Sequence, residues 1–176
     1  MFLELLQKRR SIRSFTRQPV EPEKVEQLVE AALRSPSSRS LDPWEFVVVT
    51  DPQLLSGLAK AKPHGGSFLT GAPLAIVVCG DPAKCDVWIE DCSIATLNLH
   101  LAATGLGLGS CWIQIRLRDH DRDVPAGQYI RSLLKIPDHL QVEAIVAIGY
   151  PAESKNGHDK ASLKYDRVSY NGYHRK

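Results

Sequence analysis

Four cations and two hydroxyls are concentrated in the eight residues KRRSIRSF, at positions 8–15. Arg9, Ser11 and Arg13 alternate, so in an extended segment their side chains point to the same side. Two guanidinium groups and a hydroxyl on one side can bind a phosphate through charge-assisted hydrogen bonds. The same cations would also complement the dipole of a helix that ends here. The segment alone leaves both interpretations open.

A second polar segment, SPSSRSLDPW at positions 35–44, follows a predicted helix and is rich in turn residues. The hydroxyls of Ser37 and Ser38 and the backbone N–H groups around them are suited to the polar edge of a ligand. Trp44 begins a strand that anchors the loop. A plain connection between a helix and a strand explains the same residues, so this segment too supports two interpretations.

The glycine-rich segment GLGLGS, at 105–110, is not predicted to bind a dinucleotide. A dinucleotide fingerprint needs a strand before it and a helix after it, so that the phosphates meet a helix N-terminus. Here the predicted order is helix first and strand second. We therefore predict a helix C-cap, with Gly105 or Gly107 in the left-handed conformation and the backbone open to a planar ligand beside SCWIQ.

Other catalytic and metal motifs are missing from the sequence. It has no G-x-S-x-G, no H-E-x-x-H and no P-loop lysine, and its six histidines lack metal-ligand spacing. His100 lies in a predicted buried helix and is expected to be a hydrogen-bonded core residue. The alternating Asp119, Asp121 and Asp123 lack the glycine and distal glutamate of a calcium loop, so a solvated turn is expected.

Composition restricts the class of protein. The chain has 176 residues, 43% of them hydrophobic, and a formal net charge of +2, which fits one soluble domain with a sizeable core. This near-neutral balance argues against a nucleic-acid-binding protein, and no apolar run approaches the roughly 20 residues of a membrane span. The amino terminus does not resemble a signal peptide. The four cysteines include no C-x-x-C pair, so a reducing, cytoplasmic location is the expectation.

Apolar periodicity and turn residues predict five helices and four strands. The helices are expected at 2–9, 21–35, 51–61, 86–104 and 124–136, and the strands at 44–50, 72–80, 111–115 and 142–151. Because the order opens with two helices, we predict an α+β fold with a mixed sheet between helical layers. The 86–104 helix is apolar on nearly every side, so a protein partner is expected to cover part of it.

Taken together, several stretches resemble the nitroreductase family of FMN-dependent oxidoreductases. They are RRSIRSF, AALRSPSSRSLDPWEFVVV, GAPLAIVVCGD, DCSIATLNLHLAATGLGLGSCWI, VAIGYP and the aromatic tail YDRVSYNGYHRK. They occur in the family's order and without large gaps. Each motif is weak alone, whereas the series is specific.

The resemblance implies a fold, an assembly and an activity. The fold is a three-layer helix/mixed-sheet/helix α+β domain covering residues 1–176, in an intertwined homodimer whose 152–176 extension embraces the partner. The activity is transfer of a hydride from NADH or NADPH through bound FMN to a nitroaromatic, a quinone or a similar small acceptor, by a ping-pong mechanism. Because the flavin carries the chemistry, no catalytic side chain and no metal are implied.

The resemblance also implies which residues contact FMN. In the family, the amino-terminal basic segment binds the phosphate and the pyrimidine end of the ring, which corresponds here to Arg9, Arg10, Ser11 and Arg13. A basic residue after the last strand completes the phosphate site, with Lys160 as the first choice and Arg167 as the second. The partner subunit contributes Pro36, Ser37, Ser38 and Ser40. His64, Ile113 and Gln114 lie beside the ring.

Some positions depart from the family pattern. Ser40 and Asp42 replace an asparagine and a glutamine of the loop before Trp44, and Gln114 stands where a glycine is common. These differences leave other functions open, namely dehydrogenase or dehalogenase chemistry on the same fold, or a flavin-binding protein without catalysis. A nucleic-acid module is disfavoured by the charge balance.

Overall fold

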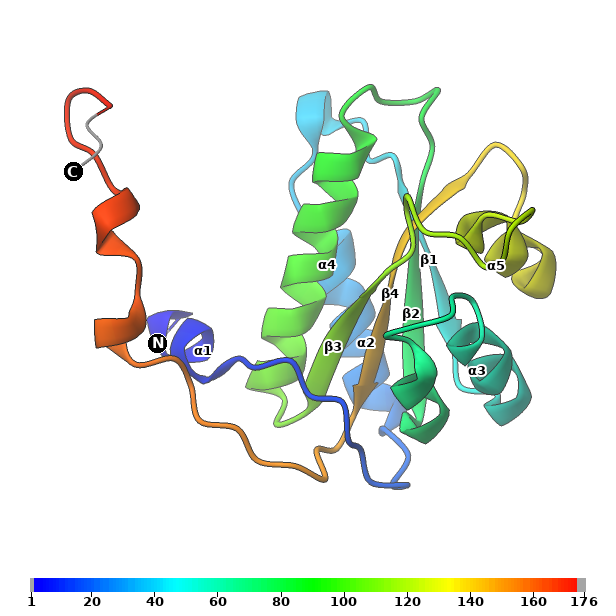
Figure 1. The fold of residues 1–176 in the computed structure, drawn as a ribbon, viewed down its shortest axis with the longest axis horizontal. Coiled ribbons are helices and arrows are strands. Elements are labelled where there is room, and N and C mark those ends of the chain that lie inside the picture. Colours follow the sequence, from blue (N-terminus) through cyan, green and yellow to red (C-terminus); the bar gives the residue numbers. More distant parts are fainter. Residues whose placement is uncertain (1, 174–176) are drawn as a thin grey trace.

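The computed structural model describes residues 2–173 as a four-stranded antiparallel sheet between two helical layers (Figure 1). The strands are β1 (Trp44–Val49), β2 (Leu74–Gly80), β3 (Gly109–Gln114) and β4 (Gln141–Gly149), in the spatial order β1-β2-β4-β3. The helices are α1 (Phe2–Lys8), α2 (Pro22–Leu33), α3 (Pro52–Ala59), α4 (Trp88–Gly105) and α5 (Ala126–Leu134). The predicted α+β class and the order of the elements are confirmed.

The sheet differs in one respect from the prediction of a mixed sheet. All pairs of neighbouring strands are antiparallel. Within residues 2–173, parallel pairing is confined to an isolated bridge between Ser11 and Ser110, which brings the amino-terminal segment to the free edge of β3. That bridge is too short to form a fifth strand, and β1 forms the other edge of the sheet.

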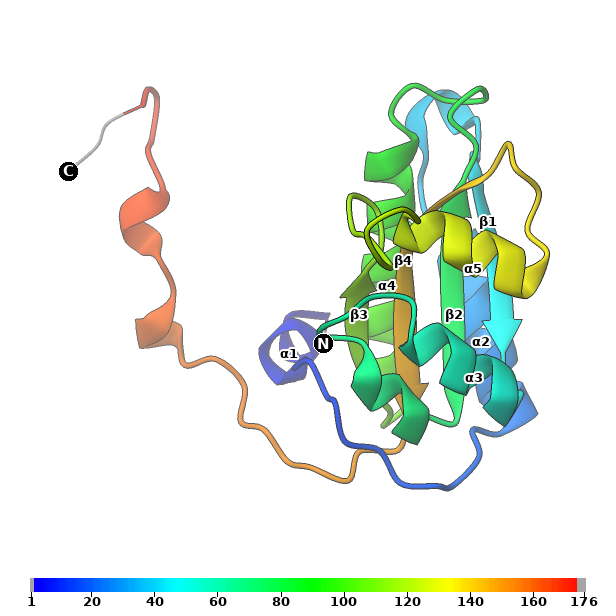
Figure 2. The ribbon, with the colours of Figure 1, turned by 45° about the vertical axis from the view of Figure 1, so that its right-hand side comes forward.

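Helices α2 and α4 cover one face of the sheet, and α3 and α5 cover the other (Figure 2). All of β2 is buried, as is typical of a central strand with both faces covered. The helix starts follow ordinary capping rules. Pro22 occupies the first turn of α2, and the Asp51 carboxylate accepts the N–H groups of Gln53 and Leu54 at the start of α3.

Helix α4 is the longest described helix and contacts α2, all four strands of the sheet and α1. Its C-terminal end is followed by Gly107, which has φ of 74° and so confirms the prediction of a left-handed glycine; Gly105 instead closes the helix. The side chains of Ile94 and Leu97 on α4 are 40% and 47% exposed, although the rest of the helix is largely buried. No described helix is both long and apolar enough to cross a membrane.

The chain after β4 leaves the domain. Residues 152–173 run past α1 and then away from the sheet, with short 3-10 turns at Lys160–Ser162 and Tyr165–Arg167 (Figure 1). The absence of helical periodicity in this tail is confirmed by its extended path. Several large apolar side chains of this segment are exposed, namely Leu163, Tyr165, Val168, Tyr170 and Tyr173.

His100 is a buried core histidine, as predicted. It is 6% exposed, and its Nδ1 lies 2.7 Å from the hydroxyl of Ser110 on β3. Burial, with a smaller contribution from the nearby charge of Arg9, lowers the pKa of His100 from 6.5 to about 4. Between about pH 4 and pH 6.5, the imidazole is therefore neutral in the folded protein and protonated in the unfolded chain.

We expect this histidine to make stability depend on pH. Its contribution is complete above about pH 6.5 and is lost as the pH falls toward 4, because the unfolded chain then binds the extra proton. The loss is on the order of 3 kcal/mol. Urea unfolding of the wild type and of His100→Gln between about pH 4 and pH 6.5 measures this loss as the change of the unfolding free energy with pH. An identical slope of unfolding free energy in both proteins would contradict the assignment.

Candidate functional site

The amino-terminal segment after α1 lies along the edge of β3. The N–H of Ile12 donates to the carbonyl of Ser110 at 3.0 Å. Gly109 permits this approach, because a Cβ at that position would lie 2.9 Å from the Cβ of Ile12. Farther along, the N–H of Thr16 donates to the carbonyl of Tyr150 at 2.8 Å. The predicted phosphate-binding segment is therefore extended backbone, held between β3 and the end of β4.

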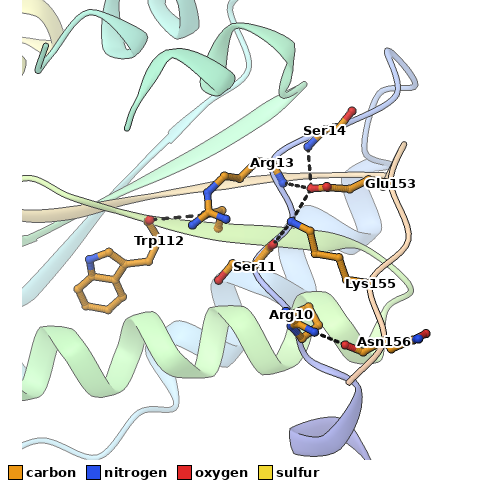
Figure 3. A network of polar contacts seen from close by, with 9 residues as sticks. Arg10, Ser11, Arg13, Ser14, Trp112, Glu153, Lys155 and Asn156 are labelled. Carbon is orange, nitrogen blue, oxygen red and sulfur yellow. Dashed lines mark hydrogen bonds and ion pairs between the residues drawn. The ribbon is translucent and has the colours of Figure 1, made fainter. Parts of the chain in front are cut away.

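One carboxylate joins this segment to the tail. Oε1 of Glu153 accepts the N–H of Arg13 at 2.5 Å and of Ser14 at 3.2 Å, and also accepts from Nζ of Lys155 at 3.1 Å (Figure 3). Lys155 donates in addition to the carbonyl of Ser11 at 2.9 Å. The backbone bond from Arg13 and the bond from Lys155 lower the pKa of Glu153. We refer to this arrangement as the Glu153 clasp.

The tail continues past the end of α1 in close contact with it. A guanidinium nitrogen of Arg10 donates to the carbonyl of Asn156 (Figure 3). A Cβ at Gly157 would lie 2.0 Å from the carbonyl oxygen of Gln7, so only glycine fits there. Arg10 thus binds the tail in this chain, while Arg9 lies at the C-terminal end of α1 and near enough to His100 to affect its pKa.

Three cations are near enough to the buried thiol of Cys111 on β3 to interact with it electrostatically. Burial raises the pKa of this thiol, whereas the charges of Arg13 and Lys155 and a hydrogen bond from Ser11 lower it. Lys62 also interacts with the thiol, and burial together with the charge of Arg118 lowers the pKa of Lys62. We call Ser11, Arg13, Lys62 and Lys155 the cation recess.

An aromatic ring and an aliphatic side chain accompany the cation recess. The guanidinium carbon of Arg13 lies 5.9 Å from the centre of the Phe68 ring. The loop before Phe68 approaches β3, because a Cβ on Gly66 would lie 3.9 Å from a methyl carbon of Ile113. The site thus combines positive charge with an apolar wall.

The residues predicted beside a flavin ring occupy this same region in three different ways. Ile113 is buried, at 2% exposure, and supports the wall from within. The side chain of Gln114 is fixed, since it accepts from the indole N–H of Trp112 at 2.9 Å and donates to the carbonyl of Arg116 at 2.9 Å. His64 is exposed in the 62–66 loop.

The P-S-S segment lies elsewhere in the same chain. The N–H of Ser38 donates to the buried carboxylate of Asp91 at 3.0 Å, near the start of α4. His100, which senses Arg9, is nine residues farther along α4, or roughly 14 Å at 1.5 Å per residue. A single chain therefore keeps the P-S-S segment and the cation recess at different ends of α4.

The P-S-S loop is built from unusual backbone. Arg39, Ser40 and Asp42 have φ of 55°, 53° and 47°, a region that non-glycine residues rarely adopt. The hydroxyl of Ser37 donates to the Asp42 carboxylate at 2.5 Å and accepts the N–H of the same residue at 3.0 Å. The carboxylate of Asp42, which departs from the family pattern, is thereby bound within the loop. Pro36 is exposed at the start of the loop.

Lys160 and Arg167, the basic residues predicted to complete a phosphate site, lie exposed in the two 3-10 turns of the tail. Within this chain, the tail cation that reaches the amino-terminal segment is Lys155. Sequence reasoning missed Lys155, Glu153, Lys62 and Phe68. The alternation of Glu153 and Lys155 directly after Tyr150-Pro151 was the available signal, because alternate residues of an extended segment share one side.

Metal binding has no support in the described part of the chain. Residues 2–173 contain no group of three or more histidine, cysteine or acidic side chains placed to hold an ion. The turn at 119–123 is of the solvated kind that we expected, since the Asp121 carboxylate accepts the N–H groups of Asp123 and Val124 at 2.9 Å.

We expect Glu153→Ala to release the amino-terminal segment without unfolding the sheet. The amides of Arg13 and Ser14 lose their acceptor, so their hydrogen exchange should accelerate, while exchange in β2 stays unchanged. Because the pKa of Glu153 lies below its usual value of 4.5, the wild-type protection should hold at pH 5 and above and disappear at lower pH. Glu26→Ala, at an exposed position of α2, is the control. Unchanged exchange at both amides would contradict the clasp.

Comparison with known proteins places these features in a family. The model of the nitroreductase family matches residues 6–65 and 58–150. An FMN-dependent nitroreductase from Clostridium difficile has the same fold, with a TM-score of 0.96 and 46% identity over 97% of this chain and 99% of that one. A relative from Archaeoglobus fulgidus, provisionally named an NADH dehydrogenase/NAD(P)H nitroreductase, is 37% identical over 158 residues, which is 88% of this chain and 87% of its own.

A more distant relative is the FMN reductase (NADPH) of Bacillus subtilis, 27% identical over 85% of this chain and 66% of its own length. The family match begins within α1, spans the other helices, the sheet and the P-S-S loop, and ends at Tyr150, directly after β4. The match over most of the chain, the high identity to solved and curated relatives and the shared fold agree, and this chain belongs to the nitroreductase family.

Proposed function

We propose that this protein is an FMN-dependent NAD(P)H oxidoreductase that reduces a small acceptor such as a nitroaromatic or a quinone. The observation that carries the proposal is the cation recess, which gathers Arg13, Lys62 and Lys155 beside an apolar wall on β3. Membership of the nitroreductase family and the printed activities of its relatives support the cofactor and the electron donor.

The residues present fit FMN. Its phosphate is a dianion and needs fixed positive charge and hydrogen-bond donors, which Ser11, Arg13 and Lys155 offer from two segments held by the Glu153 clasp. Its ring system is flat and largely apolar, which suits Phe68 and the Ile113 side of β3. We assign the phosphate to the clasped segment and the ring to the apolar wall.

When bound, FMN supplies the hydride chemistry, accepting two electrons from NADH or NADPH and delivering them to the acceptor. The chain's own residues would bind the flavin, orient its ring and tune its reduction potential. The Glu153 clasp fixes the backbone of Arg13, and the Phe68 ring lies 5.9 Å from its guanidinium carbon. From this place between the clasped segment and the apolar wall, the cation would bind the phosphate and would also stabilise negative charge on the near edge of a bound ring. Gln114 is locked by its neighbours and holds the backbone at the end of β3 in one conformation.

We infer that the working unit is a homodimer with two shared sites. The P-S-S loop cannot reach the cation recess of its own chain, because α4 separates them. A second chain can supply it. Exposed apolar side chains mark the surfaces available for this contact: Ile94 and Leu97 on α4, Phe2, Leu3 and Leu6 on α1, and those of the tail. Exposed large apolar side chains of this kind are typical of surfaces that another protein chain covers.

Two further aspects remain part of the proposal. One small site that admits donor and acceptor in turn implies ping-pong kinetics.

The four cysteines are all free thiols and all buried, which fits a reducing compartment such as the cytoplasm. We assign Lys155 to the phosphate site in this chain, and we retain Lys160 and Arg167 as residues whose position in the dimer would bring them to the partner's site.

The function is tested with purified protein reconstituted with FMN. We expect oxidation of NADH or NADPH that depends on added nitroaromatic or quinone, with parallel lines in double-reciprocal plots. Arg13→Ala should weaken FMN binding by at least about tenfold, the loss of one charge-assisted interaction, whereas Arg17→Ala, an exposed arginine of the same segment, should change it by less than about twofold. No binding of FMN by the wild type, or equal FMN affinity in both variants, would overturn the proposal.

The homodimer is tested with a charge on the exposed stripe of α4. Leu97→Asp should give a chain of half the native mass in sedimentation, and it should lose FMN, because the site would lack the second chain. Gln53→Asp, exposed on α3 on the other side of the sheet, should remain dimeric and yellow. A Leu97→Asp protein that sediments as a monomer and keeps its FMN would refute the shared site.

A further inference from the structure

A second positively charged cavity lies beyond the carboxyl end of β3, outside the cation recess. It has a volume of about 450 Å³ and is lined by the loop that follows β3, the first turn of α5 and the start of β4. The side chains that matter here are three arginines and two amides, namely Arg116, Arg118, Arg131, Gln128 and Gln141.

The positive charge of this cavity is not balanced by its lining. Asp119 is the carboxylate among the lining residues of the described chain. Arg131 approaches Asp138 only at 3.9 Å, and Asp138 is fully exposed, so this contact is weak. Nε of Arg131 is buried without a hydrogen-bond partner in the described structure. Nη1 of the same guanidinium donates to the side-chain oxygen of Gln141 at 3.3 Å, a neutral partner that leaves the charge of Arg131 without a close carboxylate.

Glu143 lies behind the cavity and supplies part of the compensation for Arg116. It is 4% exposed, and burial raises the pKa of its carboxyl, while the charge of Arg116 opposes that rise. Glu90 is close enough to Glu143 to raise its pKa as well, but neither of these glutamates lines the cavity. The lining itself has three arginines and one carboxylate, Asp119, which leaves an excess of cations. The excess therefore belongs to the cavity itself rather than to an internal ion pair.

The first turn of α5 adds donors to the same wall. Gly127 and Gln128 line the cavity, and the N–H groups of a first helical turn have no partner within their own helix. The N–H of Ala126 donates to the carbonyl of Arg118 at 2.9 Å, which fixes the arginine loop against the helix. Arginine forks and a helix N-terminus are both suited to the oxygens of a phosphate.

An apolar side chain stands between two of the arginines. Leu117 is 77% exposed and has φ of 58°, a conformation that non-glycine residues rarely adopt. This arrangement holds an apolar surface at the rim of a cationic cavity. A ligand with both a phosphate and an aromatic base would use both features.

We propose that this cavity binds the phosphates of a nucleotide, and that the nucleotide is the adenylate half of the dinucleotide electron donor. The second part rests on the proposed function. The cavity is separate from the cation recess, yet both border the end of β3, since Gln114 precedes Arg116 by two residues. A donor whose nicotinamide reaches the ring at one end can place its diphosphate at the arginines.

The test uses the FMN-loaded protein and the double variant Arg116→Gln/Arg118→Gln, with Arg122→Gln as control. Arg122 is exposed on the same loop and does not line the cavity. Calorimetric titration with inorganic pyrophosphate should give a Kd at least about tenfold higher in the double variant than in wild type or control. FMN affinity should match among the three proteins. Equal pyrophosphate affinity in all three, or none in wild type, overturns the site.

Kinetics identify the source of the phosphates. The KM for NADH should rise about tenfold in the double variant, whereas the KM for reduced nicotinamide mononucleotide, which lacks the adenylate, should stay the same. An unchanged KM for NADH alongside lost pyrophosphate binding overturns the dinucleotide assignment and indicates a separate phosphate ligand. A protein that binds pyrophosphate at these arginines but oxidises neither nicotinamide overturns the proposed function and leaves the anion site standing.

Discussion

The geometry of the candidate site depends on one carboxylate. Glu153 binds the backbone of Arg13 and Ser14 from 140 and 139 residues away in the sequence, and it holds Lys155 against the carbonyl of Ser11. Backbone bonds of Ile12 and Thr16 hold the amino-terminal segment against β3 and the end of β4, and the Glu153 carboxylate adds the link from this segment to Lys155 of the tail. The two cations from distant parts of the chain are thus brought together before any ligand binds, which lowers the ordering cost of binding.

Helix α4 imposes the second constraint. It packs against the sheet along its length, holds the P-S-S loop through Asp91 near one end and contacts the amino-terminal region near the other. Its length keeps apart two segments that we expected to contact one cofactor. In the homodimer that we propose, a second chain would supply the missing segment, and the exposed leucine and isoleucine of α4 would lie on the surface that it covers.

The elements of the fold were largely predictable, because each carries a local signal. Pro22, Asp51 and Gly107 mark helix ends by rules that depend on a few neighbouring residues, and the buried run before Gly80 has the composition of a central strand. Whether two strands pair parallel or antiparallel depends on contacts between distant segments and has no local signal. For this reason the sheet is antiparallel where we expected a mixed sheet.

The site was predictable only in part. The sequence KRRSIRSF indicated a cationic segment. Whether its cations face a ligand depends on Glu153 and Lys155, which bind this segment from about 140 residues away in the sequence. The same is true of Lys62, which lies in a loop with no motif and reaches the recess through the packing of that loop on β3. The loop at Ser37–Asp42 could be recognised from its residue types, whereas its left-handed backbone could not.

The central claim is that clasped cations of the amino-terminal segment and the tail bind a phosphate group. FMN and riboflavin share a ring and differ by that phosphate. The ratio of the protein's affinities for the two flavins therefore measures most directly how strongly the cations bind a phosphate. We predict that FMN binds at least about a hundredfold more tightly, the equivalent of about 2.7 kcal/mol from charge-assisted hydrogen bonds. Equal affinities for the two flavins would show that the cations do not hold a phosphate and would contradict the account.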